Sequence, residues 1–197
     1  MASNISFNPM LTTSPQNSFV VQTRGRVQGV IDDDPVTRLR LKGGILASTE
    51  NPIYGGIPIT ELVPSSTGNL LLGPTVKWAT ALANVNGMCV FNQAYNGIIV
   101  PGGGVPTYGP LMSVMFFEIG TKARICVPIS GTLAASVQGN PVNANVTWDF
   151  VNNVLTEYDG TNAFPCKILD VEANCSLVSV TSGVASWTTG TGALIEI

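Results

Sequence analysis

The chain has 197 residues and a formal net charge of −3; only 11% of its residues are charged and it contains no histidine. The charge excludes a general attraction to nucleic acid or anionic lipid, and the lack of histidine excludes a histidine general base and any zinc site with histidine ligands. The 45% hydrophobic content disfavours disorder.

Residues 1–18 are polar, with a few isolated apolar side chains. This spacing is too sparse for a core element and predicts an extended N-terminal arm, followed by one β-rich domain over 19–197. The arm's apolar side chains are candidate contacts to a partner, namely Phe7, Met10 and Leu11. The first ten residues lack the basic and apolar stretches of a secretory signal, so synthesis in a cytoplasm and reduced thiols are expected.

From Phe19 to Val30 the pattern predicts a strand that bends at its glycines, and the IDDDP sequence that follows predicts a turn. Residues 36–41 alternate apolar and basic side chains, which predicts a second strand.

Four arginines lie on these two predicted strands, two residues apart in each pair: Arg24, Arg26, Arg38 and Arg40. Side chains two residues apart on a strand share a face, so neighbouring strands would form a small cationic patch. One interpretation is a site for an acidic protein partner, because arginine suits interface ion pairs. The other is a solvated outer face, paired with the aspartates at 32–34.

The middle of the chain is rich in turn residues. Gly43 and Gly44 predict a chain reversal, residues 50–75 with their four prolines predict a long connection, and residues 75–83 alone suggest a short helix. Further strands are expected at 87–93, 97–100, 111–119, 122–129, 132–137, 145–150, 153–157, 164–171, 175–180 and 193–197.

Turn signals connect several of these strands. The pair 111–119 and 122–129 is predicted to form a β-hairpin, and Asn152-Asn153 and Asp159-Gly160 are hairpin-type turns. A subdivision near residue 130 is possible. Val, Ile and Thr make up 55 of the 197 residues, and these residues favour strands. The fold class is therefore all-β, an antiparallel sandwich or barrel of many short strands.

No motif of catalysis or cofactor binding is found. The triple glycine at 102–104 lacks the lysine and helix of a phosphate loop, and the aspartates at 32–34 lack the spacing of a calcium loop. The four cysteines form no C-x-x-C pair, and Cys89 and Cys126 lie in apolar strand patterns where cysteine acts as a small hydrophobe. The chain is therefore predicted not to be an enzyme, with no catalytic residue, cofactor or metal.

The low charge indicates a protein that forms interfaces, because interfaces are depleted in Lys, Glu and Asp. A charge-poor, β-rich chain with a polar arm is typical of a subunit in a large assembly. The same composition suits an adhesin or a fibre head.

Several segments resemble a family of tailed-bacteriophage head proteins, described as structural, decoration or capsid cement proteins. They cover most of the chain from residue 27 onward: VQG (27–29), DPV (34–36) leading to Arg38, GGILASTE (43–50), YGGI (54–57), VFNQA (90–94), MSV (112–114), GTKARI (120–125), VTWD (146–149), PCKILDV (165–171), VASW (184–187) and ALIEI (193–197).

The resemblance implies a structural virion protein, assembled in the cytoplasm of a host bacterium, on the outer surface of an icosahedral head. Its partners would be the major capsid protein, whose neighbouring subunits it cements, and further copies of itself in a dimer or trimer; no nucleic acid or membrane is expected. The alternative is a receptor- or carbohydrate-binding β module of a phage tail or fibre, in which Tyr108 of the 101–110 loop could stack on a sugar.

Overall fold

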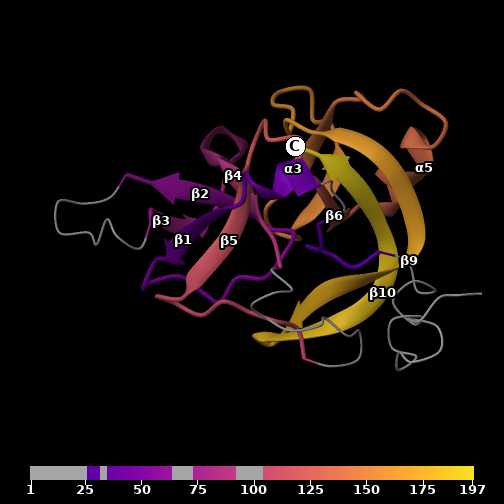
Figure 1. The fold of residues 1–197 in the computed structure, drawn as a ribbon. Helices are drawn as coiled ribbons and strands as arrows, with labels where there is room; N and C mark the ends of the chain where they lie inside the picture. The colour runs from indigo at the N-terminus through magenta and orange to yellow at the C-terminus, as the bar shows by residue number, and fades with distance from the viewer. Residues whose placement is uncertain (1–25, 32–34, 64–72, 92–103) are drawn as a thin grey trace, which may run out of the picture.

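The computed structural model describes residues 26–31, 35–63, 73–91 and 104–197. Two β-rich lobes lie side by side (Figure 1). The first is a closed barrel in the strand order β1-β3-β2-β4-β5. Its strands are β1 (Lys42–Leu46), β2 (Pro58–Leu62), β3 (Thr75–Trp78), β4 (Gly87–Cys89) and β5 (Ser113–Glu118). All barrel pairs are antiparallel except β1 with β3.

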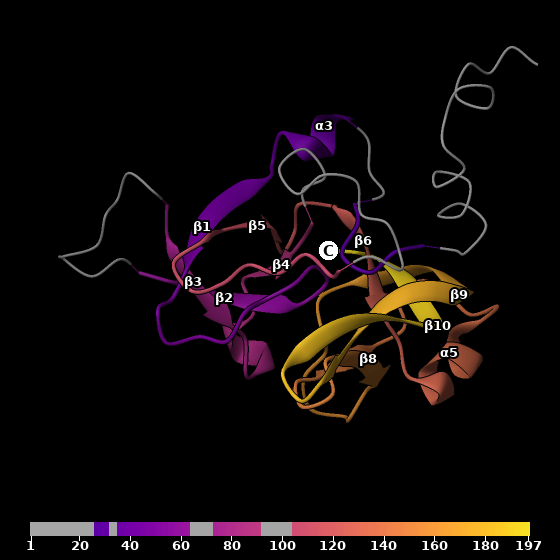
Figure 2. The ribbon, with the colours of Figure 1, turned by 90° about the horizontal axis from the view of Figure 1, so that it is seen from below.

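The second lobe contains a three-stranded antiparallel sheet in the order β6-β10-β9 and a separate hairpin, β7-β8. The strands are β6 (Arg124–Pro128), β7 (Val146–Asp149), β8 (Val154–Glu157), β9 (Lys167–Thr181) and β10 (Val184–Glu196). The long β9–β10 hairpin curves around this lobe (Figures 1 and 2). The predicted all-β class is confirmed.

Two large hydrophobic clusters make up most of the core. One fills the barrel around Leu46, Phe91 and Phe116. The other combines barrel residues such as Phe117 with second-lobe residues such as Ile195, so the lobes share a core.

Residues 26–31 join the lobes. Val27 forms a bridge with Ser176 of β9, and Ile31 forms one with Ile125 of β6. This segment therefore contacts both outer strands of the β6-β10-β9 sheet, and in Figure 1 it runs in indigo toward β9. The strand predicted from residue 19 is wrong over 26–31, which make only isolated bridges, and its earlier part lies outside the described residues.

At the centre of this junction, Gln28 is 1% exposed. Its side-chain Nε2 donates to the Gly55 carbonyl of the barrel lobe (3.1 Å), and its Oε1 accepts from the Val178 N–H of β9 (2.9 Å). Gly29 has a φ of +73°, and a Cβ built on it would lie 2.4 Å from the Gly55 backbone. Glycine is required here by both conformation and close approach.

The strand predicted for 36–41 is wrong. Residues Pro35–Arg38 form a helical turn, α3, because proline is favoured at the first position of a helix, where its missing N–H costs nothing. Leu39 is 85% exposed, so the alternating pattern does not mark a buried face.

Strands are found in two places where glycine or proline had predicted a turn or a connection. Gly43 and Gly44 lie inside β1 rather than at a reversal. A Cβ on Gly44 would lie 2.8 Å from the Val76 side chain and 2.9 Å from the Pro74 carbonyl, so this glycine allows β1 and β3 to approach. Similarly, the connection predicted for 50–75 contains β2.

Two further assignments of secondary structure are wrong. The helix suggested for 75–83 is β3 followed by a 3-10 turn, η2 (Leu82–Asn84). The strand predicted for 132–137 is a helix, α5 (Gly131–Val137), because Ser130 caps it by accepting the Leu133 N–H at 3.3 Å.

The predicted hairpin of 111–119 with 122–129 is also wrong, although both strands exist as β5 and β6. β5 pairs with β1 and β4 in the barrel, whereas β6 pairs with β10. The positive φ values of Gly120 (+91°) and Lys122 (+66°) turn the chain from one lobe into the other.

The remaining strands follow the prediction more closely. β7 and β8 are joined through Asn152-Asn153 as expected, with Asn153 at φ +54°. The strands predicted at 164–171 and 175–180 form the single long β9, and 193–197 is the end of β10. Asp159-Gly160 lies in a turn after β8 that joins no paired strands. The strand predicted at 97–100 and the arm at 1–18 lie outside the described residues.

Candidate functional site

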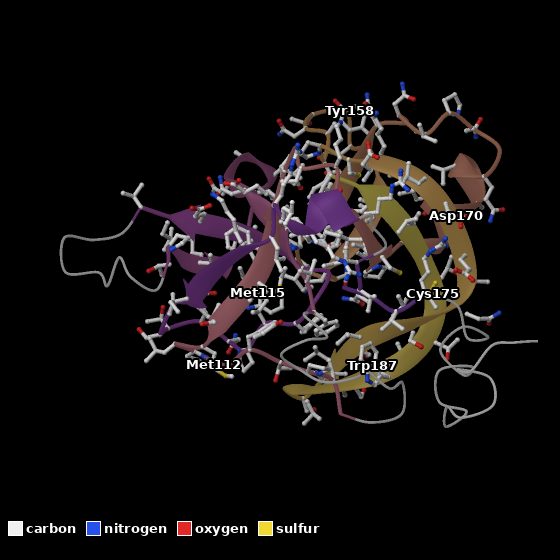
Figure 3. All side chains as sticks on the ribbon, viewed as in Figure 1. Met112, Met115, Tyr158, Asp170, Cys175 and Trp187 are labelled. Atoms are coloured by element: carbon white, nitrogen blue, oxygen red, sulfur yellow. The ribbon has the colours of Figure 1, made fainter. Side chains whose placement is uncertain are left out.

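The predicted arginine patch is not assembled from two adjacent strands. Arg26 makes ion pairs within the chain, from Nη1 to Asp170 Oδ2 (2.7 Å) and to Glu172 Oε2 (3.0 Å) on β9; Asp170 is labelled in Figure 3. Arg38 is part of α3, and Arg40 donates from Nη1 to the Thr121 carbonyl at 3.2 Å. Arg24, Phe7, Met10 and Leu11 lie outside the described residues. A role for these residues in an interface stays a prediction.

A different set of basic side chains gathers near Arg40. Glu196 of β10 pairs in register with Arg124 of β6 on one side and Lys167 of β9 on the other. Its carboxylate oxygens lie 3.9 Å from nitrogens of Lys122, Arg124 and Lys167. Arg40 is linked to the same turn through Thr121. We call Arg40, Lys122, Arg124 and Lys167 the basic cluster.

Among the described residues, the ion pairs of the basic cluster all go to one carboxylate, that of Glu196. Glu196 is only 16% exposed, whereas Lys122, Arg124 and Lys167 are 63%, 53% and 48% exposed. Sequence reasoning missed this set because its members come from three separate segments, at residue 40, at 122–124 and at 167. The only local sign of the cluster in the sequence is that Lys122 and Arg124 are two residues apart.

A cleft of about 790 Å³ lies where three parts of the fold meet. The barrel lobe supplies residues 50–54, Trp78 and the 105–107 segment, the β7–β8 turn supplies Val151 and Asn153, and the tip of the β9–β10 hairpin supplies 180 and 183–185. Figure 2 shows this hairpin running beside β8. We call this opening the hairpin cleft.

Aromatic side chains form one wall of the hairpin cleft. The rings of Tyr54 and Trp78 meet edge to face, with centroids 5.7 Å apart. The Trp78 indole N–H donates to the Asn51 carbonyl (3.1 Å), and its backbone N–H donates to Glu50 Oε2 (3.4 Å). These contacts hold the half-buried indole in one orientation.

Tyr54 carries a polar group with spare bonding capacity. It is only 5% exposed, and burial raises the pKa of its phenol. Among the described residues, the Tyr54 hydroxyl has no hydrogen-bond partner, and it is not one of the buried polar atoms that lack a partner, so the oxygen itself is open to solvent.

The opposite wall is apolar and is held by an aspartate turn. Val151, Val180 and Val184 are 88%, 51% and 67% exposed. Asp149 Oδ1 accepts the N–H groups of Val151 (2.8 Å) and Asn152 (3.0 Å). Hydrogen bonds from Asn152 and Val151 lower the pKa of the Asp149 carboxyl. The turn that presents Val151 and Asn153 is therefore well defined.

Tyr108 does not have the role that the carbohydrate interpretation gave it. Its side chain is 5% exposed, its hydroxyl donates to the Val90 carbonyl at 3.1 Å, and its backbone bridges Ile53. It anchors the 104–110 segment to the barrel and presents no face for stacking.

The four cysteines are not disulfide-bonded. The predicted burial of Cys89 and Cys126 is confirmed. Cys126 packs against Cys175 of β9, which is labelled in Figure 3. A hydrogen bond between the two thiols lowers the pKa of Cys175 to about 7 and raises the pKa of Cys126. Across the described ranges, no group of three or more Cys, Asp or Glu side chains is placed to hold a metal ion.

None of the helices in the described part of the chain has the length and apolarity needed to cross a membrane. In comparisons with known proteins, no family model, no curated protein and no solved structure matches the chain.

Proposed function

We propose that the protein is a structural virion protein that binds the outer surface of an icosahedral phage head and cements neighbouring major capsid subunits. The segments quoted above and the low charge favour this role over an enzymatic one. Partners are the major capsid protein and further copies of this chain.

The basic cluster is the observation that carries the proposal. Arg124 and Lys167 lie on the β6-β10-β9 sheet, so they are held on a rigid base. Lys122 lies on the adjoining turn, and Arg40 donates to the Thr121 carbonyl of that turn. Three of them share one carboxylate at 3.9 Å, which is longer than a good charge-assisted hydrogen bond of about 2.7–2.9 Å. They can therefore pair with acidic side chains of a capsid subunit at little cost to the fold.

Individual exposed ion pairs contribute at most about 1 kcal/mol, so one such contact would be weak. A protein present in many copies on a lattice gains from linked contacts, because each bound copy raises the effective concentration of the next contact. Modest charge pairs therefore suffice for a cement protein.

Neutralising the basic cluster is expected to weaken head binding. With Lys122→Gln and Lys167→Gln together, affinity for purified heads that lack the protein should fall by about tenfold, and the dependence on salt should become shallower. Co-sedimentation at two salt concentrations measures both. The matched control is Lys42→Gln with Lys77→Gln, which removes the same charge from the barrel lobe. Equal binding by the two double variants would contradict a role for the basic cluster.

Copy number tests the proposed function itself. Mass spectrometry of purified virions should give hundreds of copies, near an integer ratio to the major capsid protein, and heads lacking the protein should lose resistance to heat. A few copies to a few dozen would indicate the alternative, a receptor- or carbohydrate-binding module of a tail or fibre. Absence from the particle would contradict both.

A further inference from the structure

The hairpin cleft has the composition of a ligand site rather than of a structural gap. Its volume of about 790 Å³ lies within the range of about 300–1,000 Å³ typical of small-molecule sites. Such sites combine apolar and aromatic walls with a few polar groups. Here the walls are Trp78, Tyr54 and the three exposed valines.

The charge of the lining limits the ligand class. Among the described residues that line the cleft, none is basic and one, Glu50, is acidic. An anionic ligand, such as a phosphate, a carboxylate or a sialylated glycan, would meet a carboxylate without a countercharge. The ligand is therefore neutral or cationic.

The polar groups of the lining indicate a ligand rich in hydroxyls. The Tyr54 hydroxyl and the Asn153 amide have no hydrogen-bond partner among the described residues, and Glu50 uses only Oε2, at 3.4 Å from the Trp78 nitrogen. A hydroxyl both donates and accepts, so it can satisfy a phenol, an amide and a carboxylate.

We infer that the hairpin cleft binds a neutral saccharide, with a sugar face on the Trp78 indole and sugar hydroxyls bonded to Tyr54, Glu50 and Asn153. A sugar ring has an apolar C–H face beside its hydroxyls, which matches an aromatic wall bordered by polar groups. This activity is additional to capsid binding, because the cleft shares no residue with the basic cluster.

Asn153 allows a clean test because of its backbone. Its φ of +54° is one that glycine adopts freely, so Asn153→Gly removes the amide without straining the turn. Asn174 provides a matched control, since it has a φ of +66°, is exposed on β9 and does not line the cleft.

The experiment uses the full-length protein and an array of neutral and sialylated oligosaccharides, followed by calorimetric titration of the neutral glycan retained best. Neutral glycans should be retained and sialylated ones should not. Asn153→Gly and Tyr54→Phe should each weaken binding by about fivefold to tenfold, Trp78→Ala should abolish it, and Asn174→Gly should leave it unchanged.

Three results would overturn the inference: no neutral glycan bound at millimolar concentration, a preference for sialylated glycans, or equal affinities of the Asn153→Gly and Asn174→Gly variants. If Trp78→Ala fails to fold, the Tyr54→Phe and Asn153→Gly variants still test whether the saccharide binds in the hairpin cleft. Self-association that is lost in Val184→Asp would also overturn it, because a second copy would then occupy the cleft. The copy number in the virion does not depend on any of these results. The proposed capsid function and the saccharide site can therefore be contradicted independently of each other.

Discussion

Replacing Gly29 with alanine is expected to lower the free energy of unfolding by about 2–5 kcal/mol. Two costs add in this estimate. A non-glycine residue at a φ of +73° costs about 1–2 kcal/mol, and overpacking a filled site costs about 1–3 kcal/mol more. The new Cβ would lie 2.4 Å from the Gly55 backbone, which cannot rotate away as a side chain could.

Gly120→Ala separates these two costs. Gly120 has a φ of +91°, but a Cβ on it would have no atom within 4 Å. This variant should therefore lose only the conformational part, about 1–2 kcal/mol. Urea unfolding followed by fluorescence measures both variants. Equal losses would show that the contact between residues 29 and 55 is not tight in solution.

Replacing Gln28 with leucine should cost about 2–4 kcal/mol, although leucine has a similar size. The change leaves the Gly55 carbonyl and the Val178 N–H without their side-chain partner, and a buried group left unpaired costs about 1–3 kcal/mol. Gln138→Leu is the control, because Gln138 is exposed and surface changes usually stay within about 0.5 kcal/mol. Similar unfolding free energies for the two variants would contradict the role of Gln28 at the junction.

Gln28→Glu adds a pH test of the same site. A carboxylate at this buried position has a native pKa above its unfolded value, because burial disfavours the charged form. Stability should therefore be highest at low pH, where the carboxyl is protonated and can donate to the Gly55 carbonyl, and should fall as pH rises through the native pKa. Wild-type protein measured over the same pH range provides the baseline.

The sequence predicted the fold class and several strands because local patterns determine them. β7 and β8 combine alternating apolar residues with an Asn-Asn turn, and β5 and β6 are apolar runs of strand length. Local patterns do not predict secondary structure where a capping hydrogen bond favours helix over strand. The segment at 132–137 is helical because the Ser130 side chain caps it and because its leucine and two alanines are good helix formers.

Local sequence patterns could not predict which strands pair with each other. β5 and β6 are consecutive and separated by a short glycine-containing turn, yet each pairs with a strand distant in the chain. The two candidate sites depend on such pairings. Glu196 meets Arg124 and Lys167 only because β10 lies between β6 and β9, and Trp78 shares a cleft with Val184 only because the lobes pack together.

The position of β10 also bears on how the chain folds. β10 is the central strand of its sheet, yet it follows both of its partners in the sequence. During synthesis β6 therefore lacks its partner strand until β10 has left the ribosome, and residues 26–31 reach Ser176 only after β9 has emerged. Contacts of such large sequence separation make folding slow, so the pairing of β6 is a late step in the folding of this lobe. Until then β6 presents an unpaired apolar edge, which other chains can bind.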